Sequence, residues 1–200
     1  MEKIEVKIKD IIDNTIENFK REFYEKDVFY YIDISSVDNV TKSIIEAKEL
    51  KTKDAPSRAK HILKTGDIIL SNVRPNLNAV ALIPDEYNGS IGSSGFTVIR
   101  VKKEYSNELL FQVLTSPLFI DYVEDLVQGA MYPAINDDDI KNFKVKIPKK
   151  LNEQVQLAQN LKKKLIRVED LRKAAIKQLE AIQALPKRIL KEELNFDGKN

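Results

Sequence analysis

The first 150 residues consist of short apolar runs separated by turn signals. The runs are rich in β-branched and aromatic side chains and end near Gly, Pro, Asn or Asp, which is typical of strands. The predicted strands are Val28–Ile34, Ile68–Leu70, Asn78–Pro84, Phe96–Val101 and Phe143–Ile147. The second of them follows a turn, Lys64-Thr65-Gly66-Asp67. The pattern therefore predicts a domain built from many short strands.

Between Glu108 and Leu126 the apolar positions change to a helical period. Pro117 lies inside this stretch, so we expect two helices, with Ser116 capping the second and Pro117 as its first residue. Together with the strands, this helical pair predicts an α+β fold for residues 1–150.

A single long helix is expected from Asn152, which can cap it. Glycine and proline are absent between Leu151 and Leu185. We expect Pro186 to kink or end the helix and a short amphipathic tail to follow. The helix carries a heptad seam whose members step alternately by four and three residues. The seam consists of Leu161, Leu165, Val168, Arg172, Ala175, Leu179 and Ile182.

A helix of this length has too few neighbours in the preceding domain to bury its whole apolar stripe. We therefore predict that residues 151–200 form a long C-terminal coiled-coil helix, which pairs with another copy of the chain or with a partner. The alternative is a helix that folds back on its own domain.

The composition narrows the possible chemistry. The chain has 200 residues, 42% hydrophobic and 32% charged, with no cysteine and a single histidine, His61. Such values are typical of a globular protein. A disulfide scaffold, a thiolate zinc site and a cysteine nucleophile are excluded, and only His61 could serve a Ser-His-Asp centre. Because the start lacks an apolar signal core and no apolar run is long enough to span a membrane, we expect a cytoplasmic protein.

The charge is unevenly distributed along a chain whose net charge is only +2. Residues 1–50 carry 8 Lys and Arg against 12 Asp and Glu, whereas residues 51–78 carry 6 against 2. A local basic segment favours contact with an anion such as nucleic acid. The alternative is a solvated, lysine-rich surface.

Two acidic patterns could indicate metal-dependent chemistry. Asp33 followed by Glu46-Ala47-Lys48 resembles a D…E-x-K nuclease, in which carboxylates hold Mg²⁺ beside a lysine. The E-x-K spacing is common in a highly charged chain, and these residues lie in a segment with helical character. Asp137-Asp138-Asp139 could bind a metal, but consecutive carboxylates point in different directions, so capping of a short helical turn before Phe143 is the alternative.

The polar loops are better suited to binding. Ser57-Arg58-Ala59-Lys60-His61 is a compact cluster of hydrogen-bond donors. Asn72-Val73-Arg74-Pro75-Asn76-Leu77-Asn78 joins two predicted strands with side chains that pair with guanine and adenine edges. Gly92-Ser93-Ser94-Gly95 offers backbone amides to a phosphate but lacks the lysine and spacing of a P-loop. Ordinary turn chemistry is the alternative for all three.

Several segments follow one another in a characteristic order from Lys7-Ile8-Lys9-Asp10-Ile11 to the terminal helix. They are Ser57–Pro75, Gly95–Arg100, Leu114–Phe119, Gly129–Ile135, Asp139-Ile140, the run to Ile147-Pro148, and Gln154 near the start of the helix. This order resembles the specificity subunit of Type I restriction–modification enzymes. Each motif is only moderately specific, but their order is quite specific.

The resemblance implies an α+β target-recognition domain that docks in the major groove of double-stranded DNA, and a spacer helix that separates it from a second such domain. Members of this family do not catalyse a reaction themselves. They recruit modification subunits, which methylate adenine with S-adenosylmethionine, and a motor nuclease subunit for cleavage. The chain itself is expected to hold no cofactor and no metal.

The usual subunit of this family has two recognition domains and two helices, whereas this chain has one of each and resembles a half-subunit. The resemblance, together with the unpaired seam, implies a homodimer whose two helices pack antiparallel. Such a dimer would read an inverted, bipartite DNA target whose gap is set by the helix length. Arg172, as the polar member of the seam, would fix the register of the pair.

We therefore predict a DNA-recognition surface and a separate dimer helix. The residues expected at DNA are Ser57, Arg58, Lys60, Asn72, Arg74, Asn76, Asn78, Ser93, Ser94 and Tyr132. The seam residues given above form the dimer helix. Two alternatives remain open: a coiled-coil interaction module without specific DNA binding, and the D…E-x-K nuclease.

Overall fold

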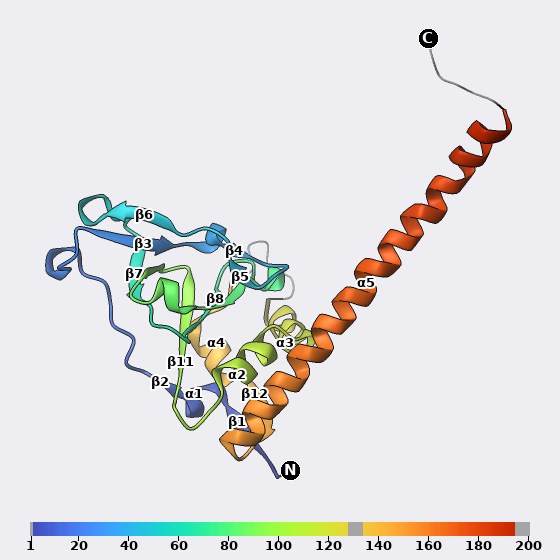
Figure 1. The fold of residues 1–200 in the computed structure, drawn as a ribbon. Helices are drawn as coiled ribbons and strands as arrows, with labels where there is room; N and C mark the ends of the chain where they lie inside the picture. The colour runs from blue at the N-terminus through green and yellow to red at the C-terminus, as the bar shows by residue number, and fades with distance from the viewer. Residues whose placement is uncertain (1, 128–133, 195–200) are drawn as a thin grey trace. The chain divides into compact units, whose positions relative to one another are not determined.

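The computed structural model describes residues 2–127 and 134–194 and, within them, every side chain except that of Asn76. These residues form two compact units, Met1–Ala158 and Gln159–Asn200, which we call unit 1 and unit 2. Unit 1 combines short strands with helices, and unit 2 is helical (Figure 1). The predicted α+β class with a long C-terminal helix is confirmed.

Two four-stranded sheets form the centre of unit 1. The first has the order β2-β11-β8-β9 and the second the order β6-β3-β10-β7. All pairings in the first sheet are antiparallel, and β10 pairs with β3 in parallel in the second. The strands are β2 (Ile12–Asp13), β3 (Val28–Ile32), β6 (Lys48–Lys51), β7 (Ala59–Ile62), β8 (Ile68–Ser71), β9 (Val80–Leu82), β10 (Ile91–Ser93) and β11 (Phe96–Val101).

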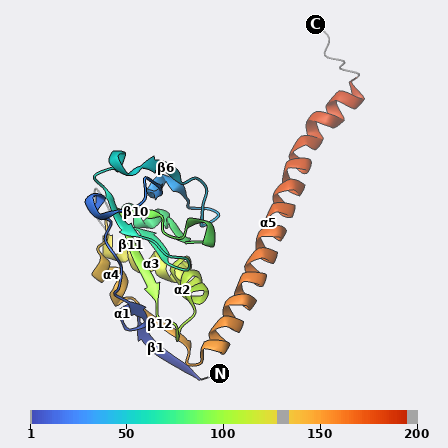
Figure 2. The ribbon, with the colours of Figure 1, turned by 60° about the vertical axis from the view of Figure 1, so that its left-hand side comes forward.

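Smaller elements complete unit 1. Strand β1 (Lys3–Lys7) pairs with β12 (Lys144–Pro148), and β4 (Val37–Asp38) pairs with β5 (Ser43–Ile44). In both views β6 lies at one end of unit 1, while β1 and β12 lie at the other (Figures 1 and 2). The helices are α1 (Ile8–Ile11), α2 (Asn107–Leu114), α3 (Pro117–Val127) and α4 (Asp137–Asn142), with short 3-10 turns that include η2 (Ile34–Ser36) and η4 (Pro75–Leu77).

The alternating pattern of the strands divides the core into separate clusters. On β8, Ile68 and Leu70 pack with the helices, whereas Ile69 points to the other face and packs with Phe96 and Val98 of β11. Successive side chains of a strand point to opposite faces, so the first sheet is buried on both sides. A third cluster, around Phe29 of β3, covers the second sheet.

The helical pair agrees with the sequence prediction except in one detail. Pro117 is the first residue of α3, and Ser106 caps α2 by accepting from the amide of Leu109. The Ser116 hydroxyl, however, donates to the carbonyl of Val113 at 2.6 Å, so its side chain closes α2. A serine at the junction of two helices can bond either way, because its hydroxyl is both donor and acceptor.

Helix α5 (Leu151–Glu193) is longer than predicted. It begins one residue before Asn152 and continues through Pro186, so the expectation that Pro186 ends the helix is wrong. Proline removes one backbone hydrogen bond, but a helix can continue past it when the flanking residues favour helix. The first turns of α5 belong to unit 1, where Gln154 is fully buried and bonds both the Ser106 amide and the Pro148 carbonyl.

Candidate nucleic-acid interface

Three turns of unit 1 lie together at one end of the β8–β11 pair. The Ser94 amide donates to the Arg58 carbonyl at 2.8 Å, and the Asn72 amide donates to the Gly95 carbonyl at 2.9 Å. A fourth segment joins them, because the amide of Ile135 donates to the Asn72 carbonyl at 3.1 Å. We call this end of the molecule the loop edge. It brings together three of the polar segments that were predicted to bind.

The basic side chains of the loop edge are accessible. Ser57, Arg58, Lys60, Arg74 and Ser94 are exposed, and Asn72 is half-buried. Arg58, Lys60 and Arg74 form no ion pair with any residue that the structure describes. Arginine and lysine side chains in this state can contact phosphates or base edges without first breaking an internal bond.

Arg74 has an unusual backbone conformation. Its φ is +50° and it precedes η4, where its carbonyl accepts from the Leu77 amide at 2.9 Å. A non-glycine residue in the left-handed region is strained, and such strain is often found at functional sites. The short turn that follows, with Pro75 at its first position, holds this conformation in place.

Two predicted contact residues are turned inward. Asn78 is 4% exposed; its side-chain amide donates to the Leu114 carbonyl at 3.0 Å, and its oxygen accepts from Lys42 at 3.1 Å. Ser93 is 3% exposed, and its hydroxyl accepts from the Gly95 amide at 3.2 Å. These two side chains stabilise the loops internally. The side chain of Asn76, and Tyr132 as a whole, lie outside what the structure describes.

A polar cluster behind the loop edge was not anticipated. Thr97 of β11 is 1% exposed, and its hydroxyl lies 2.7 Å from the side-chain oxygen of Asn72 and in hydrogen-bonding contact with the carboxylate of Asp137. Asp137 is the first residue of α4, and its side chain is 54% exposed. The signal in the sequence is a threonine inside the predicted strand Phe96–Val101, on the same face as Ile99.

His61 borders this cluster from β7. It is half-buried, and its Nδ1 atom is buried without a hydrogen-bond partner in the described residues. Burial lowers the pKa of His61, and Lys60 lowers it further, while the carboxylate of Asp137 raises it. The imidazole is therefore held towards its neutral form. No Ser-His-Asp arrangement involves His61 among the described contacts.

The carboxylates of the two acidic patterns bond to turns and helix ends of the fold. Asp33 caps η2 by accepting from the Ser35 amide and pairs with Lys48 at 2.7 Å. Partial burial raises the pKa of Asp33, but hydrogen bonds from Lys48 and Ser35 outweigh that effect and lower it. The expected helical character around Lys48 is wrong, because Lys48 begins β6 and pairs with Tyr31 of β3.

The Asp137–Asp139 run forms a cap, as the alternative reading predicted. Asn136 caps α4 by accepting from the Asp139 amide, and the Asp139 carboxylate accepts in return from the amide of Asn136. Within the described ranges, no group of three or more His, Cys, Asp or Glu side chains could hold a metal ion.

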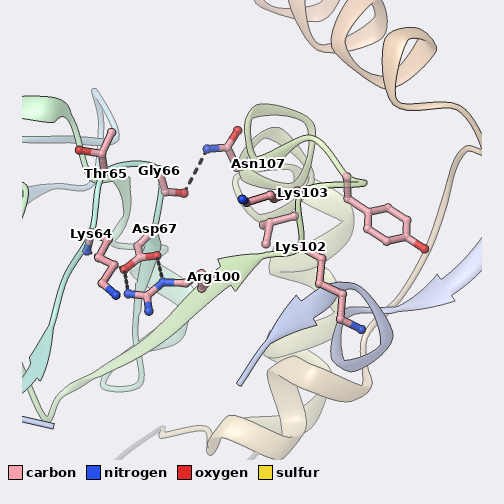
Figure 3. A pocket seen from close by; sticks show the side chains of 10 residues that line it. Lys64, Thr65, Gly66, Asp67, Arg100, Lys102, Lys103 and Asn107 are labelled. Carbon is pink, nitrogen blue, oxygen red and sulfur yellow. Dashed lines mark hydrogen bonds and ion pairs between the residues drawn. The ribbon is translucent and has the colours of Figure 1, made fainter. Parts of the chain in front are cut away.

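A pocket of about 330 Å³ lies at the opposite end of the β8–β11 pair (Figure 3). Its walls are the Lys64–Asp67 turn, the end of β11 and the segment that follows β11. Arg100 forms two hydrogen bonds, at 2.8 and 2.7 Å, with the buried carboxylate of Asp67. Lys64 pairs with Glu17, and Lys102 donates to the Asp10 carbonyl at 2.8 Å. Most of the cations that line the pocket thus hold the fold together.

The seam of α5 is accessible along unit 2. Leu165, Val168, Leu179 and Ile182 are each more than half exposed. Arg172 lies 3.7 Å from Glu169 on the same helix, and Leu161 is half-buried. No helix in the described part of the chain is long and apolar enough to cross a membrane.

Comparisons with known proteins agree with this architecture. Residues 1–181 match the family described as Type I restriction modification DNA specificity domain. The chain is 26% identical over 153 residues to the Type I restriction enzyme HindI specificity subunit of Haemophilus influenzae, a match that covers 75% of this chain and 32% of that protein.

Two solved structures share the fold. A chain from a study of complex assembly and conformational transition of the type I R-M system has a TM-score of 0.89 and 26% identity, and the match covers 99% of this chain and 51% of the other. The HsdS subunit from Thermoanaerobacter tengcongensis has a TM-score of 0.82 and 28% identity, again with 99% and 51% coverage. The chain thus spans about half the length of these solved relatives, and it belongs to the family of Type I restriction–modification DNA specificity domains.

Proposed function

We propose that the chain is a DNA sequence-recognition subunit that reads one half of a bipartite target. The observation that carries the proposal is the loop edge, where Arg58, Arg74 and Ser94 are exposed beside the half-buried amide of Asn72. Cations of this kind release counterions from the DNA backbone, and arginine and asparagine also pair with base edges in the major groove. Membership of the specificity-domain family supports the same function.

The recognition subunit has no chemistry of its own in this proposal. Modification subunits would bind S-adenosylmethionine and methylate the DNA, and a restriction motor subunit would join them for cleavage. Among the described residues, Asp33 caps a turn, and nothing forms a cluster suited to Mg²⁺. These observations argue against the D…E-x-K nuclease.

We also propose that two copies of the chain pair through the seam of α5. Leu165, Val168 and Leu179 are apolar and exposed, and such a stripe in water favours burial against a second helix. Antiparallel pairing would bring Arg172, near the middle of the seam, close to its own copy, so the two-fold axis would pass near this residue.

Selection from a random duplex library tests the recognition step. The wild-type protein is incubated with random-sequence DNA at near-physiological salt, and the bound fraction is sequenced. We expect one enriched motif with inverted symmetry. Retention on DNA only at low salt, without any enriched motif, would contradict the proposal and favour a coiled-coil interaction module, the second candidate, whose support is the exposed seam.

Light scattering over a concentration series tests the pairing. We expect a mass near twice 22.9 kDa for the wild type. Leu179→Lys places a charge in the seam and should give a monomer. Ile166→Lys is the matched control, because Ile166 is 54% exposed on the same helix but lies outside the seam. A wild type that stays monomeric at every concentration would overturn the homodimer and leave recognition of a single half-site.

A further inference from the structure

We propose that Asp137 and Asn72, both held by the hydroxyl of Thr97, form a pair of hydrogen-bond acceptors that reads the exocyclic amino group of a cytosine or an adenine. The inference rests on the proposed DNA recognition and deepens it, because it names residues that determine specificity and the chemical group that they select. Neither the family match nor the named relatives assign a role to these side chains.

The geometry fixes both acceptors at the loop edge. Thr97 is almost fully buried, on the face of β11 that the helices cover, so its hydroxyl has a constant position. Asn72 follows the last residue of β8, and Asp137 is the first residue of α4. The side chains of both residues lie within hydrogen-bonding distance of the Thr97 hydroxyl. The two groups come from segments 65 positions apart, yet one buried hydroxyl sets their separation.

The single proton of Thr97 determines which atoms face outward. The hydroxyl has two acceptors within reach, the Asn72 oxygen at 2.7 Å and the Asp137 carboxylate, but it can donate to only one. A carboxylate is the stronger acceptor, so it takes the proton. The Asn72 amide then gains most by turning its NH₂ group to the Thr97 oxygen, which leaves its own oxygen directed to the ligand.

This arrangement excludes two-atom pairing of the Asn72 amide with adenine and favours acceptance of a hydrogen bond from a base amino group. Asparagine reads adenine with both its amide atoms, but here one of the two is engaged by Thr97. With the Asn72 amide turned in this way, its oxygen becomes available to a ligand together with the second oxygen of Asp137, which lies 3.8 Å from Lys141. Both are acceptors, and in the major groove the donors among the bases are the amino groups of cytosine and adenine.

The charge of Asp137 supports a role in discrimination. A carboxylate that is 54% exposed near the loop edge repels DNA phosphates and weakens binding to every sequence alike. Such a charge contributes to recognition only where it meets a donor on a base, because a base without that donor leaves it unpaired. A carboxylate at this position therefore selects sequences and does not add general affinity.

The test compares Asp137→Ala with Asp138→Ala in the library selection. Asp138 is the neighbouring residue of the same helical turn, so it carries the same charge but has no contact with Thr97. We expect both variants to bind random DNA more tightly at low salt. Only Asp137→Ala should lose discrimination at one base pair of the half-site, by about tenfold.

Thr97→Val and Thr97→Ser separate positioning from folding. The valine variant removes the hydroxyl and should weaken the sequence preference at the same base pair. The serine variant keeps the hydroxyl and should retain that preference. Thermal melts of all four variants identify any that fail to fold. A variant that merely loosened the edge would weaken binding to every sequence and leave the motif unchanged.

The outcomes distinguish the inference from the function on which it rests. If the wild type enriches no motif, the proposed recognition function fails. If the wild type enriches a motif and Asp137→Ala keeps the same preference at every position, recognition stands and the assignment of Asp137 and Asn72 is overturned. Loss of discrimination in Asp138→Ala as well would also overturn it, since a general charge effect would then explain both variants.

Discussion

The β8–β11 pair carries basic side chains at both of its ends, and the two ends use them differently. At the loop edge, Arg58 and Arg74 are exposed and form no ion pair with the described residues. At the pocket end, Arg100 is bonded to the buried Asp67, and Lys64 is paired with Glu17. A count of basic residues along the chain cannot distinguish these ends. The difference lies in whether a carboxylate of the same unit already faces the cation.

The largest expected effect concerns the pocket end. Asp67→Ala leaves the half-buried Arg100 without its carboxylate and removes the acceptor of the Lys64 amide. Removing one partner of a buried ion pair costs about 3–5 kcal/mol, and we expect the free energy of unfolding to fall by that amount in urea titration. Lys64→Ala is the control, because its pair with Glu17 is exposed and should change stability by less than about 1 kcal/mol. Equal effects of the two variants would contradict the distinction.

The next prediction tests whether the Asn78 side chain stabilises the fold or contacts DNA. Asn78→Ala leaves the Leu114 carbonyl without its side-chain donor, removes one of the two acceptors of Lys42, and places alanine at a φ of +49°. We expect the free energy of unfolding to fall by roughly 1–3 kcal/mol. DNA affinity measured well below the melting temperature should stay close to wild type. Unchanged stability with weakened binding would return Asn78 to the set of DNA contacts.

Arg74→Gly should increase the stability of the fold and weaken DNA binding. Glycine tolerates the positive φ of this position, so relief of strain should stabilise the fold by up to about 1 kcal/mol, reduced by the greater freedom of the unfolded chain. Loss of the guanidinium should weaken binding by about 1–3 kcal/mol if it reads a guanine. Fluorescence anisotropy on the selected site and on random duplex separates the two roles, since an equal loss on both would identify a phosphate contact.

The smallest effect is the pH dependence that His61 contributes. Its pKa is lowered in the folded state, mainly by burial, from an ordinary value of 6.5. Between the lowered value and 6.5 the unfolded chain therefore binds more protons than the folded one, and stability decreases as the pH falls through this window. His61→Gln should show a shallower decrease in unfolding free energy between neutral and acidic pH. A steeper decrease would mean that the charged imidazole is the favoured form.

Much of the fold could be predicted from local patterns. The strands β8 and β11, the helical pair broken at Pro117 and the long final helix all follow from hydrophobic period and turn residues. The helical character expected around Glu46-Ala47-Lys48 was wrong because β3 offers a pairing edge to Lys48, which local sequence does not reveal. Pro186 was expected to kink or end the helix, but proline lowers helix stability without fixing where a helix ends, and α5 continues past it.

The loop edge could be predicted only in part. The sequence indicated the segments around Arg58, Arg74 and Ser94, because donors gathered between strands are visible as composition. It could not tell that Asn78 and Ser93 turn inward, since the same polar side chains serve turns and ligands. Asp137 was considered only for a metal site or a helix cap, because its contact with Thr97 joins positions 40 residues apart.

The pairing of β1 with β12 has a consequence for how the protein is made. Lys3 lies opposite Pro148 and Lys7 opposite Lys144, so the first strand of unit 1 finds its partner only at the end of that unit. At the usual pace of synthesis, β1 waits roughly 7–30 s for β12 to leave the ribosome. Until then Ile8 and Ile11, which follow β1 and are buried in the finished core, lack part of their covering, which includes Ile140. Through most of translation, these two isoleucines are therefore more accessible to water than they are in the finished fold.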